Sequence, residues 1–330
     1  MSQRHPLASD TTDVFDEVRE ACASVIAAAR HVQIDRERLR AAAAALARVG
    51  TPPVVYDTHY HHRGTAQSTL AFVVTLDAVN FGSGWFPHLC KQGSLSGYLT
   101  VAAALKRRFD AIGPFSAAEL QAMEASELAG LLGQDLSQPP VRELLQLYAR
   151  ALSDLGGFLL SRFQGSFEAL VEETSGSAAQ LVGLLAAMPF YRDVARYDGR
   201  AVPFYKRAQI TASDLSTAFG GQGLGSFKDV DRLTAFADNL VPHVLRHEGI
   251  LAVEPALAEH IAREELLPAG SEEEVELRAA AVHAIECLVQ EIRARGGSTS
   301  ARALDSALWT RGQAPEVKAR PRHRTRSVYY

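Results

Sequence analysis

The spacing of apolar residues along the chain predicts a mostly helical protein. From Thr12 or Asp13 to Arg30, apolar residues recur every three or four positions, which marks one face of a helix. Asp35 is a typical N-cap for a second helix, and Gly50 is a typical residue just beyond its end. Similar apolar stripes predict helices over about 96–109, 117–132 and 140–163.

The clearest helix is predicted over 272–295. Ser271 and Glu274 have the spacing of a capping box, in which each side chain binds a free backbone N–H of the first turn. Acidic residues in that turn complement the positive end of the helix dipole, and Gly296 closes the other end.

The segment LAFVVTLDAVNF (70–81) is ambiguous. Its composition over Phe72–Leu76 favours a strand, but the run is too short for periodicity to separate a strand from a buried helix. Residues 51–69 before it indicate a loop or short extended structure, and GSGWFP (82–87) after it indicates a turn.

The composition is that of an ordinary soluble protein, with 47% hydrophobic and 22% charged residues among 330. Since strand signals are sparse, we expect a mostly α fold with one domain over residues 1–330, of which residues 1–12 are flexible. A net charge of −4 argues against a broad surface for duplex nucleic acid, which needs concentrated Lys and Arg. The three cysteines form no CxxC pair, so the sequence indicates neither a disulfide framework nor a cysteine metal site. The sequence shows no apolar core of a signal peptide and no membrane span, so we expect a cytoplasmic protein.

A glycine-rich stretch joins two segments in DLSTAFGGQGLGSFKDVDRL (214–233). Four glycines lie between positions 220 and 225, and Ser226 with Asp229 has the spacing of a helix start. The pattern predicts a helix, a glycine-rich hairpin and a second helix. Glycines there let backbone N–H groups approach a phosphate, whereas the more ordinary interpretation is a turn that needs positive φ.

An aspartate without a cationic neighbour stands out in LTAFADNLVPHVL (233–245). If this stretch is a helix, Asp238 lies off its apolar stripe, with no Lys or Arg one turn away on either side. Pro242 then removes the hydrogen bond to the Asp238 carbonyl, so that the helix bends or ends there. Such a carboxylate is either a solvated surface residue or a group that stabilises a cationic sugar at C1′.

Two further pairs of polar residues are candidates for binding. Lys206 and Arg207 follow aromatic residues in VPFYKRAQI. The pair either binds a phosphate, or pairs with Asp238, or lies at the surface with its charged ends in water. Asp77 and Asn80 share one face if their segment is helical, and otherwise they cap the glycine turn that follows.

The loop THYHHRG and the carboxyl-terminal tail add candidate groups. The loop histidines have no HExxH pattern or cysteine beside them, which disfavours a metal site and leaves one of them as a contact for a polar ligand. The tail is basic but ends in Val328, Tyr329 and Tyr330, so we expect it to dock on the protein. Its cations are Lys318, Arg320, Arg322, Arg324 and Arg326.

Together, these motifs resemble those of the queuosine salvage family, the queuosine 5′-phosphate N-glycosylases, from about residue 13 to Tyr330. The resemblance is carried by LDAVNF, SGYLTVAAALKR, FYKRAQI, FKDVDRLTAFAD with VP following, EVELRAAAVHAIE and HRTRSVYY. It implies a helical fold similar to the helix-hairpin-helix DNA glycosylases. It also implies hydrolysis of queuosine 5′-phosphate to queuine and ribose 5-phosphate, and we expect no metal or other cofactor.

The resemblance implies roles for particular residues. The aspartate of the family's FAD motif, here Asp238, is the catalytic carboxylate, and the phenylalanine of that motif, Phe236, lies against the base. A loop histidine contacts the ligand; His59 matches best, with the histidines at 61 and 62 left open. The aspartate before the late LW pair, Asp305, contacts the 7-deazaguanine.

The chain departs from the family's common FADYRVPQ sequence. Asn239, Leu240 and His243 stand in place of Tyr, Arg and Gln, and Ser306 stands where an aromatic residue is common. These changes concern contacts to the base more than the chemistry, because Asp238 is present. Asp77, Asn80 and Ser306 remain candidate substrate contacts, and Lys206 with Arg207, or the tail arginines, are expected to hold the 5′-phosphate.

Two other functions compete with this hypothesis. A DNA base-excision glycosylase has to grip phosphates of a duplex, which the net acidic chain disfavours. The other alternative is a non-enzymatic helical module that binds a nucleotide or a partner protein. Under this hypothesis, Asp238→Asn leaves function intact. We expect a small nucleotide as the partner, with no membrane or duplex bound; the sequence leaves the oligomeric state open.

Overall fold

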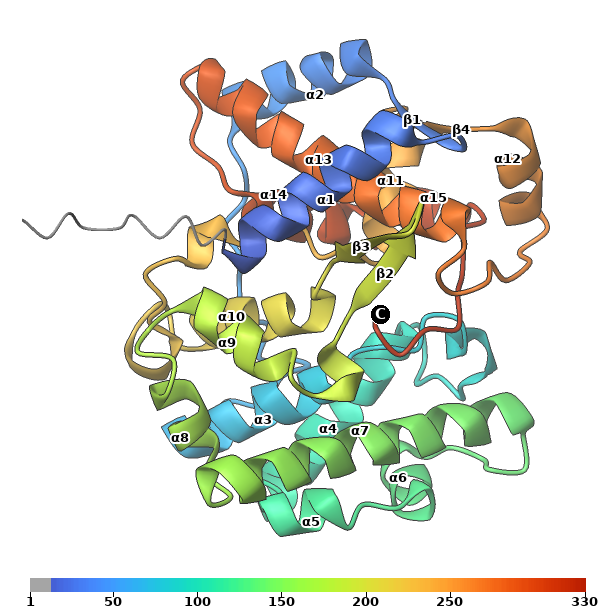
Figure 1. The fold of residues 1–330 in the computed structure, drawn as a ribbon. Helices are drawn as coiled ribbons and strands as arrows, with labels where there is room; N and C mark the ends of the chain where they lie inside the picture. Colours follow the sequence, from blue (N-terminus) through green and yellow to red (C-terminus); the bar gives the residue numbers. More distant parts are fainter. Residues whose placement is uncertain (1–12) are drawn as a thin grey trace, which may run out of the picture.

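A computed structural model describes residues 13–330, which form a mostly helical fold (Figure 1). The expectation of a flexible segment at 1–12 lies outside the described residues. In the first half the α-helices are α1 (Val14–Ala28), α2 (Arg36–Val49), α3 (Ala66–Ala78), α4 (Gly97–Ile112), α5 (Ala117–Gln121), α6 (Ala125–Leu132) and α7 (Pro139–Phe163). The second half contains α8 (Phe167–Glu172), α9 (Ala178–Leu185), α10 (Lys206–Ala218), α11 (Leu240–His247), α12 (Pro255–Ala262), α13 (Glu272–Ala294), α14 (Ala301–Arg311) and α15 (Pro315–Lys318).

Short 3₁₀ helices and two small sheets complete the secondary structure. The 3₁₀ helices are η1 (Phe86–His88), η2 (Pro189–Tyr191), η3 (Gly223–Gly225) and η4 (Val230–Arg232). Strand β1 (Val32–Ile34) pairs antiparallel with β4 (Leu251–Val253), and β2 (Val194–Tyr197) pairs antiparallel with β3 (Arg200–Pro203). The β2–β3 hairpin turns through Asp198 and Gly199, both at positive φ, which matches the twist of a tight hairpin.

The helix ends predicted from capping residues are largely confirmed. The Asp35 carboxylate accepts from the N–H groups of Glu37 and Arg38, and Gly50 has a φ of 80° at the end of α2. At α13, Ser271 accepts from the Glu274 N–H at 3.3 Å, as predicted. The Glu274 carboxylate binds the N–H of the residue before Ser271, at 3.0 Å, so the reciprocal half of the capping box is displaced by one residue. The helix expected over 117–132 is two helices, α5 and α6. The SQPP motif (137–140) starts α7, with Gln138 as the N-cap and the two prolines in the first turn.

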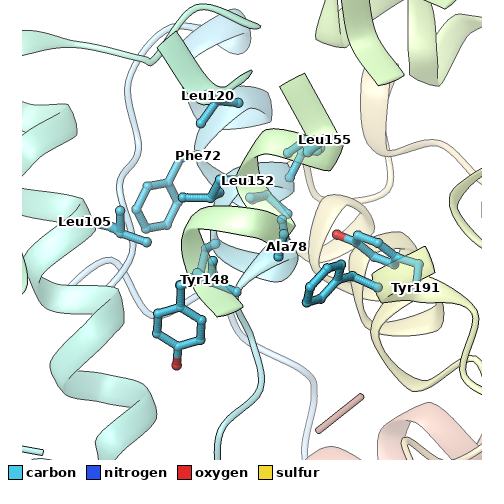
Figure 2. Close-up of a cluster of buried hydrophobic side chains, with 14 of the residues drawn as sticks. Phe72, Ala78, Leu105, Leu120, Tyr148, Leu152, Leu155 and Tyr191 are labelled. Carbon is cyan, nitrogen blue, oxygen red and sulfur yellow. The ribbon is translucent and has the colours of Figure 1, made fainter. Parts of the chain in front are cut away.

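Helix α3 corrects the strand that composition favours over Phe72–Leu76. Every side of this helix is buried from Thr69 to Ala78, so no polar face interrupts the apolar run and a helical period is invisible in the sequence. The helix also begins within the stretch expected to be a loop, because the Thr65 hydroxyl accepts from the Ser68 N–H and caps it. Figure 2 shows side chains of other helices gathered around Phe72 and Ala78.

Buried apolar side chains form two clusters, which meet at the segment 233–237. The α3 cluster joins helices of the lower half of Figure 1 and includes Phe72, Leu105, Leu120, Tyr148, Leu152 and Leu155. The α13 cluster joins helices of the upper half and includes Val18, Leu39, Leu245, Val275, Leu277 and Ile285. Most of the helices bury apolar residues in these clusters, and this burial is the main favourable term in folding.

An extended segment lies between the two clusters and corrects the helix considered over 233–245. Leu233 and Phe236 belong to the α3 cluster, whereas Ala235 and Ala237 belong to the α13 cluster. A segment that is buried on both sides needs its backbone polar groups paired, and the Thr234 N–H donates to the buried amide of Gln209 at 2.8 Å. Helix α11 begins only after this segment, at Leu240.

The glycine-rich stretch is a turn, as the more ordinary interpretation holds. Gly220, Gly221 and Gly223 have φ values between 52° and 71°, which favour glycine. The Gly220 and Gly221 N–H groups donate to carbonyls of Thr217 and Ser216, so these donors already have partners. The expected second helix does not start at Ser226. The Asp229 carboxylate instead accepts from two N–H groups at the start of α9.

The carboxyl-terminal tail docks on the protein, as its apolar ending predicts. The Tyr330 hydroxyl donates to Glu274 on α13 at 2.6 Å, and the Tyr330 carbonyl accepts from the Gly82 N–H. Gly84 allows the close approach of the tail, because a Cβ there would lie 2.5 Å from the Thr325 carbonyl oxygen. The chain end therefore joins the GSG turn after α3 to α13 (Figure 1).

His323 in this tail makes stability depend on pH. Its ring is fully buried, and burial together with the charge of Arg246 lowers its pKa to about 3. The unfolded chain takes up a proton near pH 6.5 and the folded protein does not, so stability is present above pH 6.5 and falls as the pH drops toward 3. We expect a loss of roughly 1.4 kcal/mol per pH unit from this group.

Chemical unfolding of wild type and His323→Gln between pH 7 and pH 4.5 tests this expectation. The variant should lose less stability over that range than wild type does, whatever its stability at pH 7. His88→Gln, at an exposed histidine, is the matched control and should keep the wild-type slope. An unchanged slope in His323→Gln would show that other groups dominate the acid response.

Candidate active site

The beginning of α11 fixes the position of Asp238. Its Oδ1 accepts from the N–H groups of Leu240 at 2.8 Å and Val241 at 3.0 Å. The carboxylate thus lies at the positive end of the helix dipole, which favours the anion. Pro242 falls in the first turn, where its missing N–H costs no hydrogen bond, so it starts this helix rather than bending or ending it. Asp238 is half-buried.

Two cations from distant parts of the chain lie near enough to Asp238 for its charge to act on their pKa values. Burial lowers the pKa of Lys206 at the start of α10, and the charge of Asp238 is the largest effect in the opposite direction. Burial also lowers the pKa of Arg322 in the tail, again opposed by Asp238. The absence of a cation one turn away in sequence is therefore compensated by tertiary structure.

A buried arginine, which the sequence analysis missed, holds the backbone next to Asp238. The Arg278 Nε donates to the Ala237 carbonyl at 2.9 Å, and its two terminal nitrogens bind Asp193 at 3.0 and 2.6 Å. Asp193 also accepts from the Lys206 N–H at 3.1 Å. The rings of Phe204 and Tyr330 flank the guanidinium at 4.0 and 4.6 Å. Arg278 therefore connects α13, the start of α10 and the segment before Asp238.

Asp305 and Phe236 are joined by a hydrogen bond. The Asp305 Oδ1 accepts from the Phe236 N–H at 2.8 Å. Burial, and then the charge of Asp238, raise the pKa of Asp305 well above its usual range. Ser306 follows on α14, half-buried, and its carbonyl accepts from the Thr310 hydroxyl.

Asp77 and Asn80 lie at the end of α3 beside Lys206. The Lys206 Nζ donates to the Asn80 carbonyl at 3.4 Å, and the Asn80 Nδ2 donates to Asp77 Oδ1 at 3.4 Å. Asp77 is 1% exposed, and its Oδ2 has no hydrogen-bond partner within residues 13–330. Lys206 therefore links these residues to Asp238 and Asp305. The charges of Asp77, Asp238 and Asp305 all oppose the lowering of its pKa by burial.

Arg207 is placed differently from Lys206. Its guanidinium is buried and donates to the carbonyls of Asp77, Ala78 and Phe190, and it lies over the rings of Phe81 and Tyr191. Carbonyls at the end of a helix need such donors. The geometry thus gives Arg207 a structural role at the end of α3.

The three loop histidines have different surroundings. His59 is exposed, and its ring lies 4.6 Å from that of Tyr60. His62 is buried between Asp110 at 2.6 Å and Ser68 at 3.1 Å. His61 binds the Tyr98 hydroxyl through Nε2 at 2.8 Å. Of the three, His61 is the one that influences the site, because it opposes the raised pKa of Asp214.

Asp214 on α10 is a further site residue that the sequence analysis missed. Burial raises its pKa, and His61, Arg302 and Lys206 oppose the shift. Asp214 also contributes to the raised pKa values of Asp77 and Asp305. The signal in the sequence was its position seven residues after Arg207, which puts both on one face of a helix.

The described residues thus bring Asp77, Asp214, Asp238 and Asp305 around one buried lysine, where the two hydrophobic clusters meet. A helical protein with a dipole-held carboxylate in such a site can stabilise a positive charge that develops on a bound molecule. The chain belongs to the queuosine salvage protein family, whose model matches residues 58–330.

Curated relatives match most of the chain. A protein of Sphaerobacter thermophilus is 38% identical over 93% of this chain and 95% of its own length. One from Bos taurus is 34% identical over 81% of this chain and 83% of its own, and one from Mus musculus is 30% identical over 94% and 98%. All three are named queuosine 5′-phosphate N-glycosylase/hydrolase. No helix among residues 13–330 is long and apolar enough to cross a membrane.

Proposed function

We propose that this protein hydrolyses the N-glycosidic bond of queuosine 5′-phosphate and releases queuine and ribose 5-phosphate. The names of the similar proteins support this substrate. The structural observation that carries the proposal is Asp238, whose carboxylate is held by two backbone N–H groups at the start of α11. Cleavage of an N-glycosidic bond builds positive charge at C1′, and a fixed carboxylate stabilises that charge.

The other groups have roles that follow from their positions. Asp305 and Phe236 are joined by a hydrogen bond, and we assign them to the base. The raised pKa of Asp305 favours its protonated form, which can donate to a base edge as the base departs with its electrons. Asp238 acts on the sugar, as an electrostatic stabiliser or as a transient nucleophile, and water completes the hydrolysis.

The phosphate end of the site is assigned to Lys206 and Arg322. Both face Asp238, and Arg322 belongs to a basic surface, because Arg322 and Arg324 lower the pKa of Lys91 after burial does. Arg207 is left out, since its two terminal nitrogens are engaged with carbonyls. Of the histidines, we assign the ligand contact to His61 rather than to the exposed His59.

Arg322→Met is expected to lower kcat/KM for queuosine 5′-phosphate roughly tenfold, mainly through KM, because a charge-assisted bond to phosphate is lost. Hydrolysis of queuosine itself, which lacks the phosphate, should change little. Steady-state kinetics with both substrates measure the difference. Arg320→Met, at an exposed arginine of the same tail, is the control. An equal loss for both substrates would count against the phosphate assignment.

We further propose one domain with a fold similar to the helix-hairpin-helix DNA glycosylases, acting in the cytoplasm on a small nucleotide. The helical content and the glycine turn after α10 support the likeness. The next α-helix begins only at Leu240, so the hairpin differs from the compact unit expected from the sequence.

The direct experiment is to incubate the purified protein with queuosine 5′-phosphate and follow free queuine by chromatography. Release of queuine is the expected result. Cleavage of a damaged DNA duplex without release of queuine would favour a DNA glycosylase instead. Binding of the nucleotide without turnover would favour the non-enzymatic module.

A further inference from the structure

We propose that Asp77 and Asp214, with the rings of Tyr56 and Tyr98, form a binding site for an organic ammonium group. In queuosine 5′-phosphate this group is the protonated secondary amine of the side chain on the 7-deazaguanine. The identity of the amine rests on the proposed function. The ammonium site itself is inferred from the four side chains and their neighbours.

Helices α3 and α10 bring the two carboxylates together, Asp77 from α3 and Asp214 from α10. Arg207, Thr211 and Asp214 lie at positions i, i+4 and i+7 of this helix and so share a face. The Arg207 guanidinium donates to the Asp77 carbonyl at 3.2 Å, which docks the end of α3 on that face. Asp77 and Asp214 therefore converge from two packed helices.

The carboxylates have too few positive partners for their burial. Asp77 is 1% exposed, and its Oδ2 lacks a hydrogen-bond partner within the described residues. Burial and then the charge of Asp214 raise its pKa. The Asn80 side chain, the charge of Lys206 and the Thr211 hydroxyl oppose this shift, and Lys206 is the only cation among these three. That lysine is shared with Asp238 and Asp305. An unpaired polar group in such a place is costly, and a bound cation removes the cost.

Asp214 has two more basic neighbours, and neither satisfies Asp77. His61 and Arg302 both oppose the raised pKa of Asp214. Arg302 uses Nε to bind the Ser213 hydroxyl at 2.7 Å and a terminal nitrogen to bind the Ser213 carbonyl at 3.1 Å. The surplus of negative charge is therefore on the side of Asp77.

Aromatic rings border the same carboxylates. The charges of Asp214 and Asp77, after burial, raise the pKa values of both Tyr56 and Tyr98. His61 connects the two tyrosines, with a 2.8 Å bond to the Tyr98 hydroxyl and a ring 5.3 Å from that of Tyr56. Aromatic faces beside carboxylates are a common environment for ammonium groups, because the ring quadrupole attracts a cation.

The proposed site gives the binding region two ends of opposite charge. Arg322 in the tail supplies positive charge for the phosphate, and Asp77 with Asp214 provides the carboxyl groups that pair with the amine at the other end. A nucleotide with an amine at one end and a phosphate at the other matches this order. A guanine nucleotide without the amine leaves the carboxylates unpaired, which provides discrimination.

Binding of two nucleobases to the full-length protein tests the inference without any bond cleavage. The probes are 7-aminomethyl-7-deazaguanine, which carries an ammonium group, and 7-ethyl-7-deazaguanine, which has nearly the same shape without the charge. By titration calorimetry, wild type should bind the first roughly ten to a hundred times more tightly than the second. Asp214→Asn should remove most of this preference and leave the affinity for the ethyl base nearly unchanged.

Asp231→Asn is the matched control, because Asp231 is exposed and also faces Arg302 from outside the site. It should keep the wild-type preference. Equal affinities of wild type for the two bases, or an equal loss for both in Asp214→Asn, would overturn the ammonium site, as would failure to bind either base. Release of queuine from queuosine 5′-phosphate is measured separately, so that failure of the proposed function is distinguished from failure of this inference.

Discussion

Asp238→Asn should lower kcat for queuosine 5′-phosphate by about 10²–10³-fold, the usual effect of removing a key electrostatic group. The asparagine oxygen can still accept from the N–H groups of Leu240 and Val241, so the start of α11 should remain intact. The substitution thus removes the charge and keeps the cap. Because that charge is needed most in the transition state, KM should change much less than kcat.

Asp238→Ala separates the catalytic role from the structural role. It loses both charge and cap, so it should be as inactive as Asp238→Asn and additionally less stable by about 1 kcal/mol. Thermal unfolding of both variants and single-turnover release of queuine measure the two effects. An active Asp238→Asn would disprove the catalytic role of the carboxylate and would favour the non-enzymatic alternative.

Local signals predicted the helices whose ends are set by their own residues. Asp35 and Ser271 cap helices by bonds within one turn, and these contacts are visible in sequence because they are short in range. The strand favoured at Phe72–Leu76 was wrong for the opposite reason. The character of α3 is set by burial on every side, and burial is a property of the tertiary structure.

The segment around Asp238 shows the same limit. An apolar stripe at 233–240 fits a helix, yet Leu233 and Phe236 contact one cluster while Ala235 and Ala237 contact the other. An extended segment between two cores produces such a pattern without being helical. Sequence alone had no means of showing that two clusters were present.

The residues of the candidate site were recognised mainly through family motifs. Asp238, Asp305 and Lys206 do come together in the structure. Asp214 and Arg278 escaped notice because their partners are distant in the chain, and a lone charged residue on a helix is most often a solvated one. The histidines were left open for the same reason, since only tertiary contacts separate His61 from its neighbours.

Arg278→Met is expected to destabilise the protein by about 3–5 kcal/mol, because it leaves the buried carboxylate of Asp193 without its partner. The Ala237 carbonyl loses its donor as well, so the segment before Asp238 should also lose order. The chemical unfolding midpoint measures the loss. Arg311→Met removes an exposed arginine paired with Glu316 and should leave the unfolding midpoint nearly unchanged.

A double variant shows why the effect arises. Asp193→Asn removes the buried charge but keeps an oxygen that can accept from the Lys206 N–H. If the cost of Arg278→Met comes from an orphaned charge, Arg278→Met with Asp193→Asn should be more stable than Arg278→Met alone. If the double variant is less stable than the single one, the cost lies instead in the lost packing of Arg278 between Phe204 and Tyr330. Queuine release by the double variant is measured as well. Loss of release in a folded double variant shows that the segment before Asp238 needs the Arg278 guanidinium for its position.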